Sequence, residues 1–272
     1  MKPWRLLALP LVLAAMSACR PDTVRLAYQY PADATNVYQM HAHATASWDI
    51  GGPGEGSYDV TFEVTETVES SDAGGVVVSV QMVPLEVEER GLPSPGSRQR
   101  SFALRIGPNG EVFEVLEVDG VPAQALDPDE LAFIGTYRPP LPLEPVRLRD
   151  TWRAQQQVDL EAVFQQVLTT GRLVGLRRDA AGKVADVAYS GAGPLVWATT
   201  LPQGEAELTG SAETRSDAEV DIDRGFLRRA TSSTRGEFDV RIEPGSEQAP
   251  IVGRLRLDLD LTLQKLEGPV AE

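Results

Sequence analysis

Apolar and polar residues alternate along most of the chain, which is the pattern of β-strands with one buried and one solvated face. In residues 37–48 every second side chain, from Tyr38 to Trp48, is apolar. Near the other end of the chain, leucines occupy every second position from Leu255 to Leu263. Turn-forming clusters such as Gly107-Pro108-Asn109-Gly110 separate the runs. We therefore expect a mainly antiparallel β fold, arranged as a curved open sheet or half-barrel.

Two short helices are also expected. Asp127 and Pro128 have the residue types of a helix N-cap and first helical position, and this helix should end near Gly135. A second, amphipathic helix is predicted after Asp159, because apolar residues between Leu160 and Leu168 recur at helical spacing.

The expected elements divide the chain into two parts of similar content. Residues 24–138 would form a first β half with a short helix, beginning with a strand near Val24. Residues 139–149, which are rich in proline, would form an extended connection. Residues 150–268 would form a second β half with the amphipathic helix. No residue-level repeat is visible, so two similar halves are an alternative to one continuous domain.

The first residues have the composition of a secretory signal. Two positive charges lie within Met1–Arg5, the run Leu6–Ala15 is uncharged and apolar, and small residues precede Cys19. Even when extended to Ala18, the apolar run is too short to cross about 30 Å of hydrocarbon as a helix. We therefore expect residues 1–18 to be a cleaved signal peptide.

The segment Met16-Ser17-Ala18-Cys19 resembles the lipobox of bacterial lipoproteins. The resemblance implies cleavage before Cys19 by signal peptidase II and attachment of a diacylglyceryl group to this cysteine, usually with N-acylation by a chain such as palmitate. Cys19 is thus the predicted lipidation site, and residues 19–23 are a lipidated tether. The resemblance further implies an exported protein anchored to the cell envelope, at the outer membrane if the organism is Gram-negative.

Charge restricts the partners of the protein. The chain has 40 Asp and Glu residues against 25 Lys and Arg residues, a net charge of −15. This excess of acid argues against nucleic acid, which is bound by clustered basic residues. It also disfavours electrostatic attraction to anionic lipid, so the expected membrane contact is the lipid on Cys19. Since Cys19 is the only cysteine, no disulfide is expected.

The two histidines, His41 and His43, are the candidate metal ligands. Their spacing places both imidazoles on one face of a strand, as in some metal sites. A complete site would need carboxylates from a neighbouring strand, such as Asp59 or Glu63. The alternative is two exposed histidines on a solvated face. We favour this alternative and expect neither a metal nor a cofactor.

Acidic residues at every second position of residues 217–223 resemble a calcium-binding arrangement. They are Asp217, Glu219, Asp221 and Asp223. Their spacing does not match that of an EF-hand loop, because no glutamate closes the loop at its twelfth position. We interpret them as an ordinary solvated face of a strand.

No catalytic residue can be assigned. Ser190 lacks the first glycine of a nucleophile elbow, and no histidine follows His43 that could complete a hydrolase triad in chain order. We therefore expect that the protein is not an enzyme.

Small apolar residues on the predicted inward face suggest a binding role. Side chains such as Ala42, Ala44 and Ala206 would leave room for an acyl chain between the sheet and its covering elements. The lipobox followed by an antiparallel β domain resembles the lipoprotein-carrier half-barrels of the LolA/LppX type and uncharacterised bacterial lipoproteins. The resemblance implies a membrane-anchored protein that binds an apolar ligand or lipid. The alternative is a structural lipoprotein that presents an acidic β surface to an envelope partner, whose identity the residues do not indicate.

Overall fold

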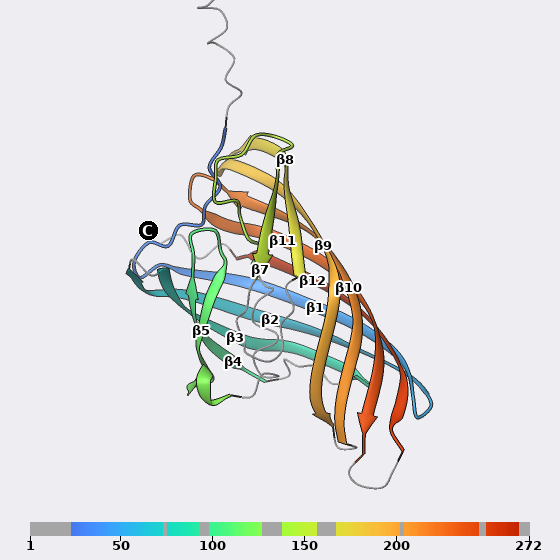
Figure 1. The fold of residues 1–272 in the computed structure, drawn as a ribbon. Coiled ribbons are helices and arrows are strands. Elements are labelled where there is room, and N and C mark those ends of the chain that lie inside the picture. Colours follow the sequence, from blue (N-terminus) through green and yellow to red (C-terminus); the bar gives the residue numbers. More distant parts are fainter. Residues whose placement is uncertain are drawn as a thin grey trace, which may run out of the picture.

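The first and last long strands of the protein pair with each other in the middle of one antiparallel sheet (Figure 1). The computed structural model describes residues 23–72, 75–92, 98–126, 138–156, 167–201, 204–244 and 249–266. The strands of the first part are β1 (Thr35–Ile50), β2 (Pro53–Asp72), β3 (Gly75–Arg90), β4 (Arg100–Ile106), β5 (Val112–Val118) and β6 (Val121–Pro122), followed by the 3-10 turn η1 (Ala123–Ala125). Those of the second part are β7 (Thr151–Gln156), β8 (Val167–Asp179), β9 (Gly182–Leu201), β10 (Gly204–Asp221), β11 (Phe226–Glu243) and β12 (Ile251–Lys265).

The order of strands across the sheet is β6-β5-β4-β3-β2-β1-β12-β11-β10-β9-β8-β7. Consecutive strands form hairpins within each part, and β1 joins the parts by pairing with β12 from Tyr38–Lys265 to Ile50–Gly253. The sheet is strongly curved and open (Figure 1). The mainly antiparallel β fold expected from the alternating pattern is therefore confirmed.

Alternation of side chains gives the sheet two chemically different faces. On β1, the side chains of Tyr38, Met40, Ala42, Ala44 and Ala46 are buried on one face, while the residues between them are exposed or partly buried. We call the face that carries these five side chains the inner face and the opposite face the outer face. Because register aligns equivalent positions of neighbouring strands, the inner face of β1, β2 and β12 is mainly apolar.

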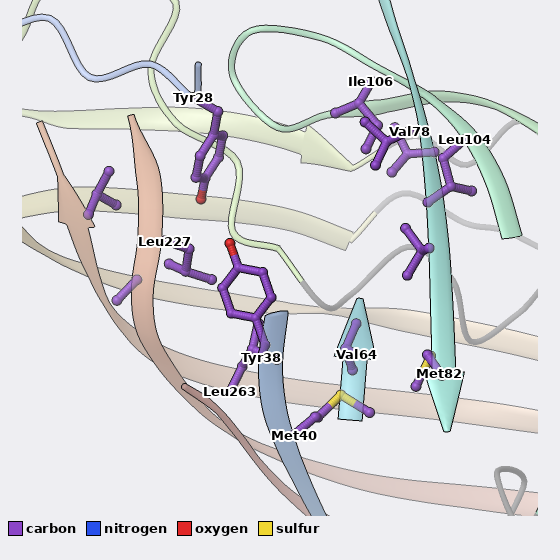
Figure 2. Packing of buried hydrophobic residues seen from close by; sticks show 14 of the residues in the cluster. Tyr28, Tyr38, Met40, Val64, Val78, Met82, Leu104, Ile106, Leu227 and Leu263 are labelled. Atoms are coloured by element: carbon purple, nitrogen blue, oxygen red, sulfur yellow. The ribbon is translucent and has the colours of Figure 1, made fainter. Parts of the chain in front are cut away.

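One end of the sheet encloses the main core. There, strands from both flanks contribute buried residues to one cluster, including Leu104 of β4 and Leu173 of β8. The segments that precede β1 and β7 add Leu26, Tyr28 and Leu141 to the same cluster. Figure 2 shows Tyr28 and Tyr38 with their hydroxyl groups directed toward one another inside it. We call this end, which also holds Tyr38 and Leu263, the closed end.

A buried ion pair crosses the closed end. Arg138 and Glu66 are joined by a salt bridge, with only 5% and 3% of their side chains exposed. The Arg138 guanidinium also donates to the Tyr30 hydroxyl at 2.9 Å and lies 4.7 Å from the centre of the Tyr28 ring. Tyr28 in turn donates to the Pro139 carbonyl at 2.9 Å. These contacts tie the chain entering β1 to the connection between the two parts.

The opposite end of the sheet, which we call the open end, is narrower. In the described chain β4 pairs with β3 only as far as Met82, and β8 pairs with β9 only as far as Gly191. Beyond these residues, β3 and β9 form the two edges of the sheet. Each edge carries one proline, Pro84 or Pro194, which cannot donate a backbone hydrogen bond.

The two parts of the chain share a further detail. Trp48 of β1 lies over Gly54 of β2, and Trp152 of β7 lies over Gly171 of β8. At both glycines a Cβ atom would lie within 2.4 Å of the indole ring, so no other residue fits. Similarity of the two halves beyond such details, and the boundaries at residues 138 and 150, stay predictions.

The two short helices are not borne out in the described part of the chain. The helix expected over Leu160–Leu168 is wrong at its C-terminal end, because Val167 and Leu168 belong to β8 and pair with β7. A short apolar run fits a helix or a strand, and here cross-strand pairing decides. Residues 160–166 and the helix expected at Asp127 lie outside the described residues. The strand expected near Val24 is a single β-bridge from Val24 to Val146.

No helix among the described residues has the length and apolar character needed to cross a membrane.

Replacement of Glu66 by Gln should destabilise the protein by about 3 to 5 kcal/mol, because it removes the negative charge of Glu66 from its ion pair with the buried Arg138 guanidinium. Urea unfolding of the chain beginning at Arg20, followed by circular dichroism, measures this loss. Asp239→Asn provides the control, since Asp239 and Arg254 form an ion pair whose side chains are 83% and 88% exposed. Its midpoint should stay unchanged, and equal midpoints for wild type and Glu66→Gln would contradict the prediction.

Candidate functional site

A row of leucines on β12 dominates the inner face between the closed and open ends. The side chains of Leu255, Leu257, Leu259 and Leu261 alternate with charged outer-face residues such as Arg256 and are partly buried. We call these four residues the leucine row. Leu257, Leu259 and Leu261 pack against the main core, whereas Leu255 packs against a second cluster at the open end. The leucine row therefore joins the two apolar clusters.

Small side chains flank the leucine row. On β1, Ala46, Ala44 and Ala42 pair with Leu257, Leu259 and Leu261 in register. On β11, Gly236, Thr234 and Ser232 pair with the same three leucines. These neighbours are short, and Ala42, Ala44 and Ala46 are themselves buried. This confirms that small residues lie on the inner face.

Aromatic side chains border the leucine row at the open end. Trp48 of β1 and Phe238 of β11 both pair with Leu255 and are partly buried. Phe238 lies against Gly236 of its own strand. The second cluster continues from there to the end of the sheet through Ala206, Leu208, Val240 and Ile242. The open half of the inner face is therefore a continuous apolar surface within the described residues.

Four hydroxyl groups lie on the inner face of β10 and β11, between this surface and the closed end. Ser216 donates to Ser232 at 2.9 Å, and Thr234 donates to Thr214 at 3.0 Å. The oxygens of Thr214 and Ser232 are 3.3 Å apart, which links the two pairs. We call these four residues the hydroxyl cluster. The pattern of inward-facing residues on these strands carried the signal for it, but sequence reasoning did not single it out.

His41 and His43 lie on the outer face, and the structure brings both to one carboxylate. His41 Nε2 is 2.8 Å from one oxygen of Asp59, and His43 Nδ1 is 3.2 Å from the other. Asp59 thus occupies the position from which a carboxylate was expected. The two histidine side chains are 47% and 43% exposed. No group of three or more metal-ligating side chains suited to a metal ion occurs among the described residues.

The histidines change the acidity of Asp59. Desolvation acts to raise the pKa of this carboxyl, but the hydrogen bonds and charge of His41, and then of His43, outweigh it and lower the pKa below its ordinary value. The three residues therefore behave as an exposed hydrogen-bonded group on the outer face.

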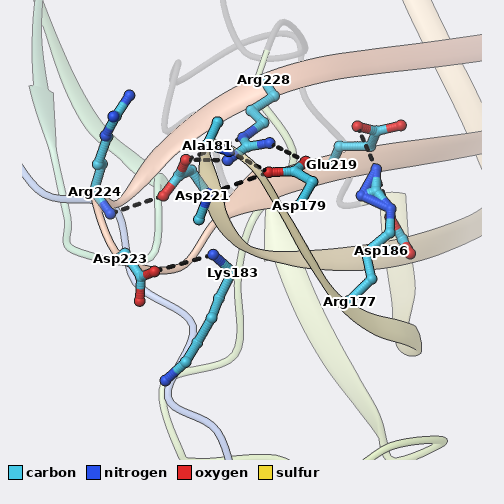
Figure 3. Close-up of polar contacts among 11 residues, drawn as sticks. Arg177, Asp179, Ala181, Lys183, Asp186, Glu219, Asp221, Asp223, Arg224 and Arg228 are labelled. Carbon is cyan, nitrogen blue, oxygen red and sulfur yellow. Dashed lines mark hydrogen bonds and ion pairs between the residues drawn. The ribbon is translucent and has the colours of Figure 1, made fainter.

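The acids interpreted as a solvated face are not all solvated. Asp221 is fully buried at the end of β10, beside the register shift at which β11 contains the extra residue Arg228. It accepts hydrogen bonds from the Arg228 guanidinium at 3.0 Å and from the Arg224 backbone at 2.9 Å (Figure 3). The interpretation is thus wrong for Asp221, which is a structural group.

Arg228 connects Asp221 to a neighbouring turn. It also donates to Asp179 at 2.7 Å, and backbone groups of Ala181 and Gly182 donate to the same carboxylate (Figure 3). Although burial alone would lower the pKa of Arg228, its hydrogen bonds to Asp221 and Asp179 raise it. The cluster stabilises the hairpin turns of β8–β9 and β10–β11.

Two of the other three acids, Asp223 and Glu219, also have specific contacts. Asp223 accepts a hydrogen bond from the Lys183 backbone at 3.0 Å, and Glu219 lies 2.7 Å from Arg177 (Figure 3). Asp217 is exposed on the outer face of β10. Partners of this kind occupy the carboxylates that a calcium ion would need.

The outer face near the open end contains open hollows with polar linings. One, of about 820 Å³, is lined by residues that include Ser47, Glu237 and Arg256. Another, of about 670 Å³, includes Glu207, Asp239 and Arg254 in its lining. Acids and arginines alternate across these surfaces. Their chemistry suits a polar partner and differs from that of the inner face.

The predicted lipidation site, Cys19, lies outside the described residues.

Comparisons with known proteins add little to these observations. No family model matches the chain, and no curated protein matches it. Among solved structures, a lipovitellin chain from work on lipid–protein interactions in lipovitellin is similar, with a TM-score of 0.44 and 11% identity. The similarity covers 90% of this chain but only 26% of the lipovitellin chain, so this chain spans about a quarter of its length. At this TM-score the likeness carries no argument.

Replacement of both His41 and His43 by Gln should raise the pKa of Asp59 toward its ordinary value of 3.8. The pKa of Asp59 is lower in the folded protein than in the unfolded chain. The histidine contacts therefore stabilise the fold at pH values above the unfolded-state pKa, and this stabilisation is lost as the pH falls through the folded-state pKa. A carboxyl NMR titration of Asp59 measures the change. Thr45→Val, on the same face of β1, is the control. An unchanged Asp59 titration in the double variant would rule out the proposed cause.

Proposed function

We propose that the protein is an exported lipoprotein, anchored to the cell envelope through Cys19, that binds an apolar ligand or lipid on the inner face of its sheet. The leucine row carries this proposal. Its side chains are only partly buried, yet they lie on the same face as the core and between two apolar clusters. Continuous apolar surface of this kind is a feature of ligand and partner sites.

The chemistry of the inner face favours an extended, flexible ligand. The leucine row spans about 20 Å along β12, from the rise of roughly 3.3 Å per residue in a strand. The side chains beside Leu257, Leu259 and Leu261 on β1 and β11 are short, so these leucines are the largest side chains that an apolar chain would meet there. Each methylene group that the chain buries contributes about 0.8 kcal/mol. A ligand such as an acyl chain would therefore bind through its length.

The anchor proposal rests on the residues around Cys19. A single saturated chain holds a protein at a membrane only marginally, so stable attachment requires the diacylglyceryl group that the lipobox implies. In this proposal the membrane holds the protein, and the sheet binds the ligand.

A second candidate function uses the outer face. The hollows near Asp49, Asp239 and Arg254 present paired charges over several strands at the open end. A structural or interaction lipoprotein would use such a surface to contact an envelope protein. Under this proposal, charge reversal at Asp239 would abolish partner crosslinking in cells, and changes in the leucine row would not affect it.

Binding at the inner face is tested by Leu259→Glu. Wild-type protein should bind the neutral fluorescent probe N-phenyl-1-naphthylamine, and the variant should bind it roughly tenfold more weakly or worse, because a carboxylate would have to be buried beneath the probe. Thr262→Glu adds the same charge to the outer face of β12 and should leave binding unchanged. Equal losses in both variants, or no binding by wild type, would contradict the inner-face proposal.

Membrane attachment is tested separately by Cys19→Ala. Wild-type protein should fractionate with membranes and label with palmitate, whereas the variant should lose both properties. Ser17→Ala, which keeps a small residue before the cysteine, is the control and should behave as wild type. A Cys19→Ala protein that remains in the membrane fraction would exclude the proposed anchor.

A further inference from the structure

The hydroxyl cluster lies beside the leucine row, at the middle of the inner face. Thr234 and Ser232 pair directly with Leu259 and Leu261 across β11 and β12. The side chains of Thr214, Ser216, Ser232 and Thr234 are all partly buried. The neighbouring inner-face positions on the same two strands, Ala218, Ala230, Ala212 and Gly236, are all small and apolar. The four hydroxyls are therefore an isolated polar group on an apolar surface.

One hydroxyl hydrogen of the cluster remains available to donate to a ligand. Four hydroxyl groups carry four hydrogens, and the three contacts among them use three. Ser216 donates to Ser232, and Thr234 donates to Thr214. In the contact between Ser232 and Thr214, one of these two residues, Ser232 or Thr214, donates its hydrogen to the other. The other keeps one hydrogen for an external acceptor. Chains of linked hydroxyls also polarise one another, which strengthens the final donor.

The surroundings of the cluster indicate an uncharged acceptor. The inner-face positions next to it on β9 and β12 are Tyr189, Gly191, Leu259 and Leu261, none of which is charged. The cation Lys265 lies on the inner face of β12, four residues and about 13 Å of strand from Leu261. Its ammonium group contacts Asn36 and lies 4.3 Å from the centre of the Phe226 ring. A carboxylate at the cluster would therefore lack a cation within contact distance among these side chains.

We propose that the hydroxyl cluster binds the carbonyl oxygen of an ester or amide in a ligand whose hydrocarbon chain lies along the leucine row. This inference rests on the proposed function, and it specifies the ligand as an acylated, uncharged molecule. Gly191 pairs with Thr214, so β9 places no side chain beside this hydroxyl. The cluster fixes the position of the chain on the sheet, while the leucines supply the apolar contact.

The quadruple variant Thr214→Val/Ser216→Ala/Ser232→Ala/Thr234→Val tests the proposal, because it removes all four hydroxyls. Removal of Thr214 and Ser232 alone would free the hydrogens of Ser216 and Thr234, which donate to them, for an external acceptor. Its ligands are methyl laurate, which has an ester carbonyl, and N-phenyl-1-naphthylamine, which has none. Methyl laurate should bind roughly two- to tenfold more weakly than to wild type, the effect of one net hydrogen bond. The naphthylamine should bind equally well to both proteins. Ser233→Ala, on the outer face of β11, is the matched control.

The outcomes separate the two proposals. Selective loss of methyl laurate affinity, with the urea midpoint retained, supports the carbonyl site. Unchanged methyl laurate affinity, or equal losses for both ligands, overturns the carbonyl site while the inner face remains a binding surface. Failure of wild type to bind either ligand overturns the proposed function and, with it, this inference.

Discussion

The pairing of β1 with β12 is the constraint on which the rest of the structure depends. Each part of the chain forms its own meander of hairpins, but within each part the central strand, β1 or β12, is paired on one side only. Thirteen residue pairs, from Tyr38–Lys265 to Ile50–Gly253, join these strands. The same pairing places the alanines of β1 beside the leucine row of β12. The apolar surface thus exists only when both ends of the chain have come together.

The closed end shows how polar groups support this arrangement. Arg138 and Glu66 are buried together, and burial also raises the pKa values of Tyr28, Tyr30 and Tyr38, although Arg138 acts to lower them. Lys265 lies in the same region, and desolvation lowers its pKa. These groups hold the segments before β1 and β7 against the sheet. As a result, the flanks of the sheet meet at one end while the other end stays open.

Local pattern predicted much of the fold, because a period of two residues is visible along each strand without knowledge of its partners. It assigned the inner positions of β1 and β12 correctly and found the turn at Asn109–Gly110. It failed at Val167, where an apolar run fits both a helix and a strand, and at Asp221, which is buried against Arg228, the extra residue of a bulge in β11. The hydroxyl cluster was missed for a related reason. Hydroxyl residues are ordinary in strands, and only the register of β10 and β11 shows that four of them meet.

The prolines at the open end have a consequence for crowding. An edge strand with free backbone groups can pair with the edge of another molecule and extend the sheet without limit. Copies present at high local concentration would meet often in this way. Pro84 and Pro194 each remove a donor from an edge of the open end, and the acids that follow Pro84 on β3 repel a second copy. The molecule can therefore keep a broad apolar face and still resist stacking into fibrils.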